Sequence, residues 1–114
     1  MIERHGRTPI MHRVVEYNGV LHVGGLVAED RSVGMKGQTE QVLQRLEAIL
    51  APFGSGRDKV LAATIYVTDL GLKKEMNEAW VAFFGEHLPT RATIGVADLG
   101  SKDTLLEVVF TAAR

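Results

Sequence analysis

Residues 13–25 read Arg-Val-Val-Glu-Tyr-Asn-Gly-Val-Leu-His-Val-Gly-Gly, and this stretch sets the first element of the fold. The β-branched and aromatic residues on both sides of Asn18-Gly19 are typical of strands. Asn-Gly is the pair preferred in a two-residue type I′ turn, in which both residues need a positive φ. The stretch therefore predicts a β-hairpin. It ends at Gly24-Gly25, where the lack of side chains lets another group approach the backbone closely.

Two helices and three strands are predicted after the hairpin. Apolar residues recur at helical spacing over about 35–53, and the prolines and glycines of 52–56 end that helix. Residues 59–69 are predicted as a strand, 72–87 as a second helix, and 91–97 and 104–113 as two closing strands. The order ββαβαββ predicts an α+β fold, with one mixed sheet and both helices on one face. At 114 residues, we expect a single domain spanning residues 1–114.

Composition excludes several classes of function. Apolar residues make up 46 % of the chain and charged residues 24 %, with a net charge of −1, so no basic balance favours nucleic-acid binding. The absence of cysteine rules out disulfides and thiolate nucleophiles, and is compatible with a reducing compartment. No apolar run approaches the ~20 residues of a membrane span, and none follows the charged first residues as in a secretory signal. We expect a cytoplasmic protein that binds neither membrane nor nucleic acid.

Side-chain alternation divides the last two strands into faces. Leu106, Val108 and Phe110 share an apolar side that we expect to face the helices, as do Ala92, Ile94 and Val96. The other face would then be mixed, with Arg91 and Glu107 surrounded by Thr64, Tyr66, Thr93, Val109 and Thr111. Such a face is too apolar for water and too polar for a core, so we predict that another copy of the chain covers it.

Arg91 and Glu107 are the leading candidates for chemistry. A guanidinium offers a planar fork for a carboxylate, and a carboxylate can hold or activate a water molecule. Structural roles remain open: Arg91 could extend to solvent or pair with an acidic residue, and Glu107 could belong to a structural ion pair, because an isolated charge between apolar neighbours is costly.

Other catalytic arrangements are not supported by the sequence. His12 and His22 are expected on different faces of the hairpin, and His5 and His87 have no ligand-spaced neighbour, so no metal site is predicted. No serine lies in a nucleophile elbow, and Gly24-Gly25 belongs to no phosphate-binding motif. The aromatic residues of the second helix have the spacing of a buried stripe rather than of a base-stacking surface.

Several segments in the same order resemble the Rid/YjgF family of reactive-intermediate (enamine/imine) deaminases, over nearly the whole chain. They are the hairpin from Val14 to Gly25, the helix 38–53, the strand 64–70, the segment 76–84, Pro89-Thr90-Arg91 and Leu106-Glu107-Val108. The short segment before the hairpin and the Asn-Glu-Ala-Trp helix look most like the YoaB-like branch. The resemblance implies a chorismate-mutase-like fold and a homotrimer that forms through the open sheet face, with clefts between subunits.

The resemblance also implies an activity: hydrolysis of 2-imino and 2-enamino acids, such as 2-aminoacrylate, to 2-oxo acids and ammonia, without cofactor or metal. Arg91 would clamp the substrate carboxylate and Glu107 would position the attacking water, while Gly25, Thr93 and Asn77 would help to hold the substrate. The chain departs from the family where a tyrosine is replaced by Met11, a serine by Gly24 and an acidic residue by Val109.

Those departures keep an alternative open, a non-catalytic binder or sensor of small carboxylate metabolites in the same cleft. Ribonuclease activity, also found among relatives, is the weakest candidate because the chain lacks a basic stripe.

Overall fold

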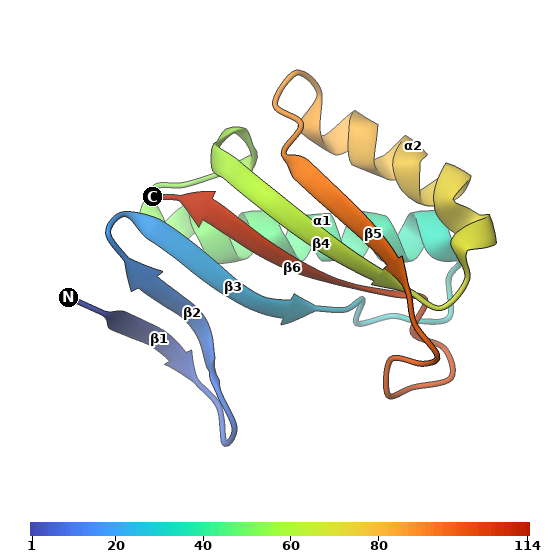
Figure 1. Ribbon diagram of the computed structural model, residues 1–114, viewed down its shortest axis with the longest axis horizontal. Coiled ribbons are helices and arrows are strands. Elements are labelled where there is room, and N and C mark those ends of the chain that lie inside the picture. Colours follow the sequence, from blue (N-terminus) through green and yellow to red (C-terminus); the bar gives the residue numbers. More distant parts are fainter.

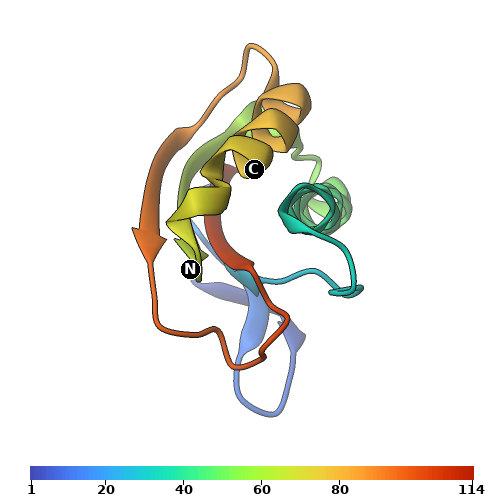
Figure 2. The ribbon, with the colours of Figure 1, turned by 90° about the vertical axis from the view of Figure 1, so that its right-hand side faces the viewer.

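The computed structural model describes residues 1–114 and contains one six-stranded sheet with two helices on one face (Figures 1 and 2). The predicted α+β class is confirmed. The helices are α1 (Met35–Leu50) and α2 (Lys73–Phe84), and short 3₁₀ turns cover Ala51–Phe53, Arg57–Lys59 and Leu70–Leu72. The strands are β1 (Glu3–Arg7), β2 (His12–Tyr17), β3 (Val20–Leu26), β4 (Val60–Val67), β5 (Thr90–Gly95) and β6 (Leu106–Ala113). No helix is both long enough and apolar enough to cross a membrane.

The strand order is β1-β2-β3-β6-β4-β5, and only β4 and β5 run parallel. The predicted hairpin is β2–β3, and Asn18 and Gly19 have φ of 52° and 76°, as a type I′ turn requires. The sheet has one strand more than predicted. β1 reads Glu-Arg-His-Gly-Arg, a sequence without apolar alternation, so the periodicity that reveals a strand is absent there.

The core lies between the helices and one face of the sheet. Its fully buried side chains include Leu46 of α1, Met76 and Phe84 of α2, Ile65 of β4, and Val108 and Phe110 of β6. The prediction that Leu106, Val108 and Phe110 face the helices is confirmed by their complete burial. The opposite face carries no helix, as Figure 2 shows.

Gln38 of α1 connects the loop before α1 with the loop before β6. Its side chain is fully buried, and its Nε2 donates to the carbonyls of Val33 and Asp103, each at 3.0 Å. Its Oε1 accepts the backbone N–H of Leu105 at 3.1 Å. One glutamine thus fixes the chain just before α1 and the entry to β6, two residues before Glu107.

Candidate active site

Glu107 lies in the centre of the sheet, on the face without helices. It is paired in register with Tyr66, and its neighbours Leu106 and Val108 are completely buried on the other side. The register of β3 against β6 shifts between Val23 and Leu26, and the Glu107 side chain extends over Gly25 within this irregular segment. A methyl group on Gly25 would overlap the Glu107 carboxylate and lie 3.1 Å from its Cδ. Residue 25 must therefore be a glycine for the Glu107 side chain to lie in this position.

Arg91 lies on the opposite face. It is paired in register with Ala63, a buried residue beneath the helices, and its Cζ lies 5.5 Å from the centre of the Trp80 ring of α2. Partial burial lowers the pKa of Arg91 from its ordinary value, because desolvation disfavours the charged form. A guanidinium remains cationic at neutral pH even so, and an anion bound to it would offset the desolvation.

Neither charge has a partner within the chain. The ion pairs of the structure involve other residues, so the pairing alternatives considered for Arg91 and Glu107 are not found. Arg91 is exposed beyond Trp80, whereas Glu107 is half-buried. Two uncompensated charges of opposite sign are thus available to a ligand.

Thr93 and Asn77 lie on the same side of the sheet as Arg91. The Thr93 side chain is paired in register with the buried Ile65. The N–H of Val96 donates to Val67 of β4, and because alternate backbone groups of a strand point to opposite sides, the Thr93 N–H points to the free edge of β5. Asn77 precedes Trp80 by one helical turn, and its Oδ1 is buried without a hydrogen-bond partner. A buried acceptor in this state calls for a donor.

The candidate residues therefore form two groups. The clamp group consists of Arg91, Thr93, Asn77 and Trp80, at the β5 edge and on α2. The Glu107 group consists of Glu107, Gly24, Gly25 and Met11, on the face without helices. The structure brings Arg91 together with Trp80, and Glu107 together with Gly25, but it does not place the two groups on one face.

The prediction that Arg91 and Thr93 share a face with Glu107 is wrong. It assumed that the more apolar side of β5 faces the helices, but β5 is an edge strand. Its helix-facing side is only partly covered, so a long cationic side chain can pass over Trp80 to solvent. The apolar Ala92 and Ile94 lie instead on the open face, in register with Thr64 and Tyr66, and Ile94 is 43 % exposed.

Two of the family departures are in contact with each other. A methyl group on Gly24 would lie 3.2 Å from Met11 Cε and 3.5 Å from its Sδ, so the thioether covers the glycine. The contact between Met11 and Gly24 is therefore apolar, and neither residue has a side-chain hydroxyl.

Trp80 was predicted only as a core residue. It is 2 % exposed and stacks on Phe110 with ring centres 6.0 Å apart, and its outer surface supports Arg91. No sequence signal distinguishes a core tryptophan that carries a guanidinium from one that does not.

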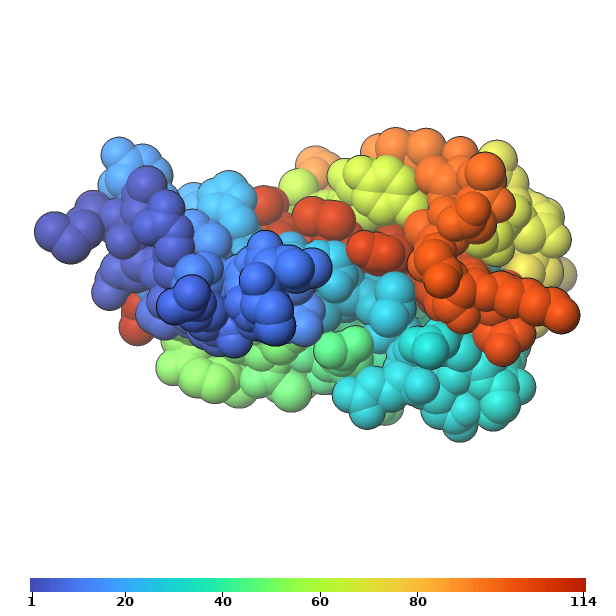
Figure 3. All heavy atoms as spheres, turned by 90° about the horizontal axis from the view of Figure 1, so that it is seen from below, coloured from blue at the N-terminus to red at the C-terminus, as the bar shows by residue number.

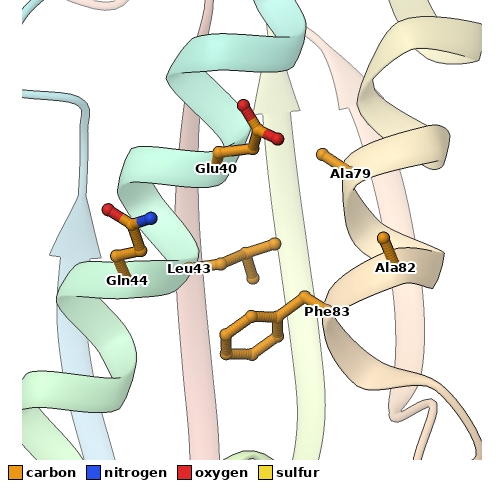
Figure 4. Close-up of a pocket in the computed structure, with 6 residues that line it drawn as sticks. All are labelled: Glu40, Leu43, Gln44, Ala79, Ala82 and Phe83. Carbon is orange, nitrogen blue, oxygen red and sulfur yellow. The ribbon is translucent and has the colours of Figure 1, made fainter.

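A hollow of about 200 Å³ lies between the two helices, as Figure 4 shows. Its walls are Glu40, Leu43 and Gln44 of α1 and Ala79, Ala82 and Phe83 of α2, and the two short alanine side chains leave space between the helices. It contains none of the candidate residues and no unpaired cationic group, and its chemistry does not suit a carboxylate ligand.

The comparisons with known proteins agree with this architecture. The family model described as Endoribonuclease L-PSP matches residues 7–114. A RutC family protein of Haemophilus ducreyi is 34 % identical over 114 residues, covering 99 % of this chain and 97 % of that protein. The RutC family protein YoaB of Escherichia coli is 34 % identical over 82 residues, 71 % of each chain. The crystal structure of a YjgF family member from Neisseria meningitidis superposes with a TM-score of 0.93 at 32 % identity, covering 100 % of this chain and 95 % of that one.

Proposed function

Because this chain belongs to the Endoribonuclease L-PSP family, the group of the Rid/YjgF proteins, we propose that it hydrolyses reactive 2-imino and 2-enamino acids to 2-oxo acids and ammonia. One observation carries the proposal: an unpaired guanidinium and an unpaired carboxylate, each held on a rigid support. 2-Aminoacrylate, which gives pyruvate, represents the substrate class.

We further propose that the site is completed between copies of the chain, in a homotrimer. Within one chain the sheet separates the clamp group from the Glu107 group, and a small ligand cannot contact both. The open face carries Ile94 and Val109, exposed by 43 % and 38 %, and β5 offers a free edge beside it. Covering this face with a neighbour would remove apolar surface from water and bring Glu107 of one copy toward Arg91 of the next.

The chemistry requires orientation and one proton carrier. The enamine first tautomerises to an imine, and Arg91 and the Thr93 N–H bind its carboxylate. The Asn77 Oδ1 accepts a hydrogen bond from the substrate nitrogen, which supplies the donor that this atom lacks. Glu107 accepts a proton from water as its oxygen bonds to the imine carbon, and then gives that proton to the nitrogen. The hydroxyl of the resulting carbinolamine then loses its proton, which Glu107 passes to the nitrogen; the C=O bond forms as the C–N bond breaks, ammonia leaves, and the 2-oxo acid remains.

The apolar contact of Met11 with Gly24 bears on the choice of substrate. Neither of these two residues offers a side-chain hydroxyl to a polar substituent. We therefore expect substrates with a hydrogen or a small apolar group on the β-carbon to be preferred over those with a hydroxyl, because a buried hydroxyl without a partner is costly.

The same absence of hydroxyl groups favours a second candidate, a non-catalytic binder of small 2-oxo acids. Binding needs only the clamp group, whereas catalysis also needs Glu107 close to the bound carbon. A binder would be stabilised against heat by 2-oxobutyrate, in a manner that depends on Arg91, without accelerating imine hydrolysis.

The experiment generates 2-aminoacrylate in situ and follows the formation of pyruvate with and without the protein. We expect the wild type to accelerate hydrolysis above the buffer rate and Arg91→Ala to lose most of that acceleration. Equal rates for the two proteins would contradict the proposal.

Light scattering of the same samples gives the oligomeric state, and a monomer at micromolar concentration would contradict the shared site. Digestion of RNA that disappears in Arg91→Ala would instead support the ribonuclease alternative.

A further inference from the structure

The Arg91 guanidinium lies over the ring of Trp80, the only tryptophan of the chain. The distance of 5.5 Å from Cζ to the ring centre is within the ~6 Å at which a cation is attracted to the face of an aromatic ring. Arg91 takes part in no ion pair, so no acidic side chain holds the guanidinium. The ring is therefore the group that can orient the guanidinium before a ligand binds.

The Trp80 ring is itself held firmly. It is 2 % exposed, its plane is 12° from that of Phe110, and its centre lies 4.9 Å from the centre of the Phe84 ring. Because β6 and β5 lie on either side of β4, Phe110 and Arg91 approach the ring from different strands. A ring packed against buried neighbours keeps one orientation, so it offers the guanidinium a fixed surface.

The rest of the Arg91 environment is open. Its partner in register on β4 is the small residue Ala63. Figure 3 shows β5 and the chain after it (orange) at the surface, at the end of the molecule opposite to β1 and β2 (blue). A long side chain at such an edge has many rotamers, and a ligand that immobilises it loses affinity. Contact with a fixed ring reduces this cost without using an N–H group, because the attraction acts on the charge.

We propose that Trp80 is a positioning residue: its ring holds the Arg91 guanidinium in the orientation that binds the substrate carboxylate. This inference rests on the proposed function and adds that the affinity for 2-oxo and 2-imino acids depends on an aromatic ring at residue 80. The carboxylate is bound alike in the ground state and in the transition state, so loss of the ring should raise KM and leave kcat unchanged.

The test measures the affinity of the full chain for 2-oxobutyrate by isothermal titration calorimetry, and KM and kcat by pyruvate formation from 2-aminoacrylate. Trp80→Phe keeps a smaller ring and Trp80→Leu keeps none, and urea titrations show whether each variant is folded. Phe83→Leu is the matched control. Phe83 lies on the same helix, and its ring carries a different arginine, Arg57, whose Cζ is 4.1 Å from the ring centre.

Trp80→Phe should weaken binding of 2-oxobutyrate by about threefold and Trp80→Leu by about tenfold, because tryptophan attracts a cation more strongly than phenylalanine does and leucine offers no ring. KM should rise in proportion while kcat stays the same. Phe83→Leu should bind 2-oxobutyrate as the wild type does. Should Trp80→Leu not fold, the comparison of Trp80→Phe with Phe83→Leu still decides.

Unchanged affinity in Trp80→Phe, an equal loss in Trp80→Phe and Phe83→Leu, or a fall in kcat at constant KM would each overturn the inference and leave the proposed function standing. If the wild type neither binds 2-oxobutyrate nor accelerates pyruvate formation, the proposed function fails, and the inference fails with it.

Discussion

The clamp group and the Glu107 group differ in how the chain supports them. Glu107 lies on a central strand, with hydrogen-bonded neighbours on both sides, over a glycine that leaves room for its side chain. Arg91 lies on an edge strand and rests on one aromatic ring. Within a single chain, the position of the carboxylate is thus fixed by its surroundings, whereas the environment of the guanidinium is incomplete. This difference indicates which half of the site depends on a second copy.

The largest effect should come from substituting the two charged residues one at a time. Glu107→Gln keeps the shape of the side chain but cannot accept a proton, so we expect kcat to fall by about 10²–10⁴-fold with little change in the affinity for 2-oxo acids. Arg91→Ala should mainly raise KM, because it removes the carboxylate clamp. Pyruvate formation and thermal shifts with 2-oxobutyrate separate the two outcomes.

Mixing these two impaired variants, assayed at a substrate concentration where each alone has little activity, tests whether the site is shared. If Arg91 and Glu107 act from different copies, co-expression produces some clefts with both native residues, about a quarter of them for random assembly. Recovery of activity near that level is expected. If the mixture stays as inactive as the separate variants, the two residues do not meet across an interface.

Gly25→Ala and Gly24→Ala form a matched pair with a smaller expected effect. A methyl group on Gly25 would displace the Glu107 carboxylate, and a displacement of about 1 Å costs on the order of 10²-fold in kcat. A methyl group on Gly24 meets the flexible end of Met11, which can move, so we expect a change within about twofold. Equal kinetics for the two variants would show that the position of Glu107 does not limit the rate.

The same contrast explains which features the sequence could predict. The β2–β3 hairpin, both helices and the face of Glu107 follow from local patterns, because turn chemistry and burial of one side determine them within a few residues. The face of Arg91 does not follow, since the pattern of an edge strand does not reveal which side the helices cover. β1 was missed because its pairing with β2 depends on backbone hydrogen bonds, not on an apolar pattern.

Gln38→Leu tests the hydrogen bonds that hold the chain just before Glu107. The substitution would leave the Leu105 N–H and two carbonyls, all in partly buried hydrogen bonds, without their partner, so we expect the free energy of unfolding to fall by about 3 kcal/mol in urea titrations. Gln41→Leu is the control, because Gln41 bonds only the exposed backbone of Asp30. If both variants lose the same free energy of unfolding, the hydrogen bonds of Gln38 stabilise the fold no more than the exposed ones of Gln41.

The smallest expected effect concerns the ion pair of Glu16 with Arg114, far from both groups. The hydrogen bond from Arg114 lowers the pKa of Glu16 below its usual value. A carboxyl whose pKa is lower in the folded state stabilises the fold above the pKa of the unfolded chain, and this contribution is lost as the pH falls through the folded-state pKa. Acidification should therefore destabilise the wild type more than Arg114→Gln, so that their unfolding midpoints converge at low pH. Parallel curves would mean that this pair, although well formed, does not couple folding to pH.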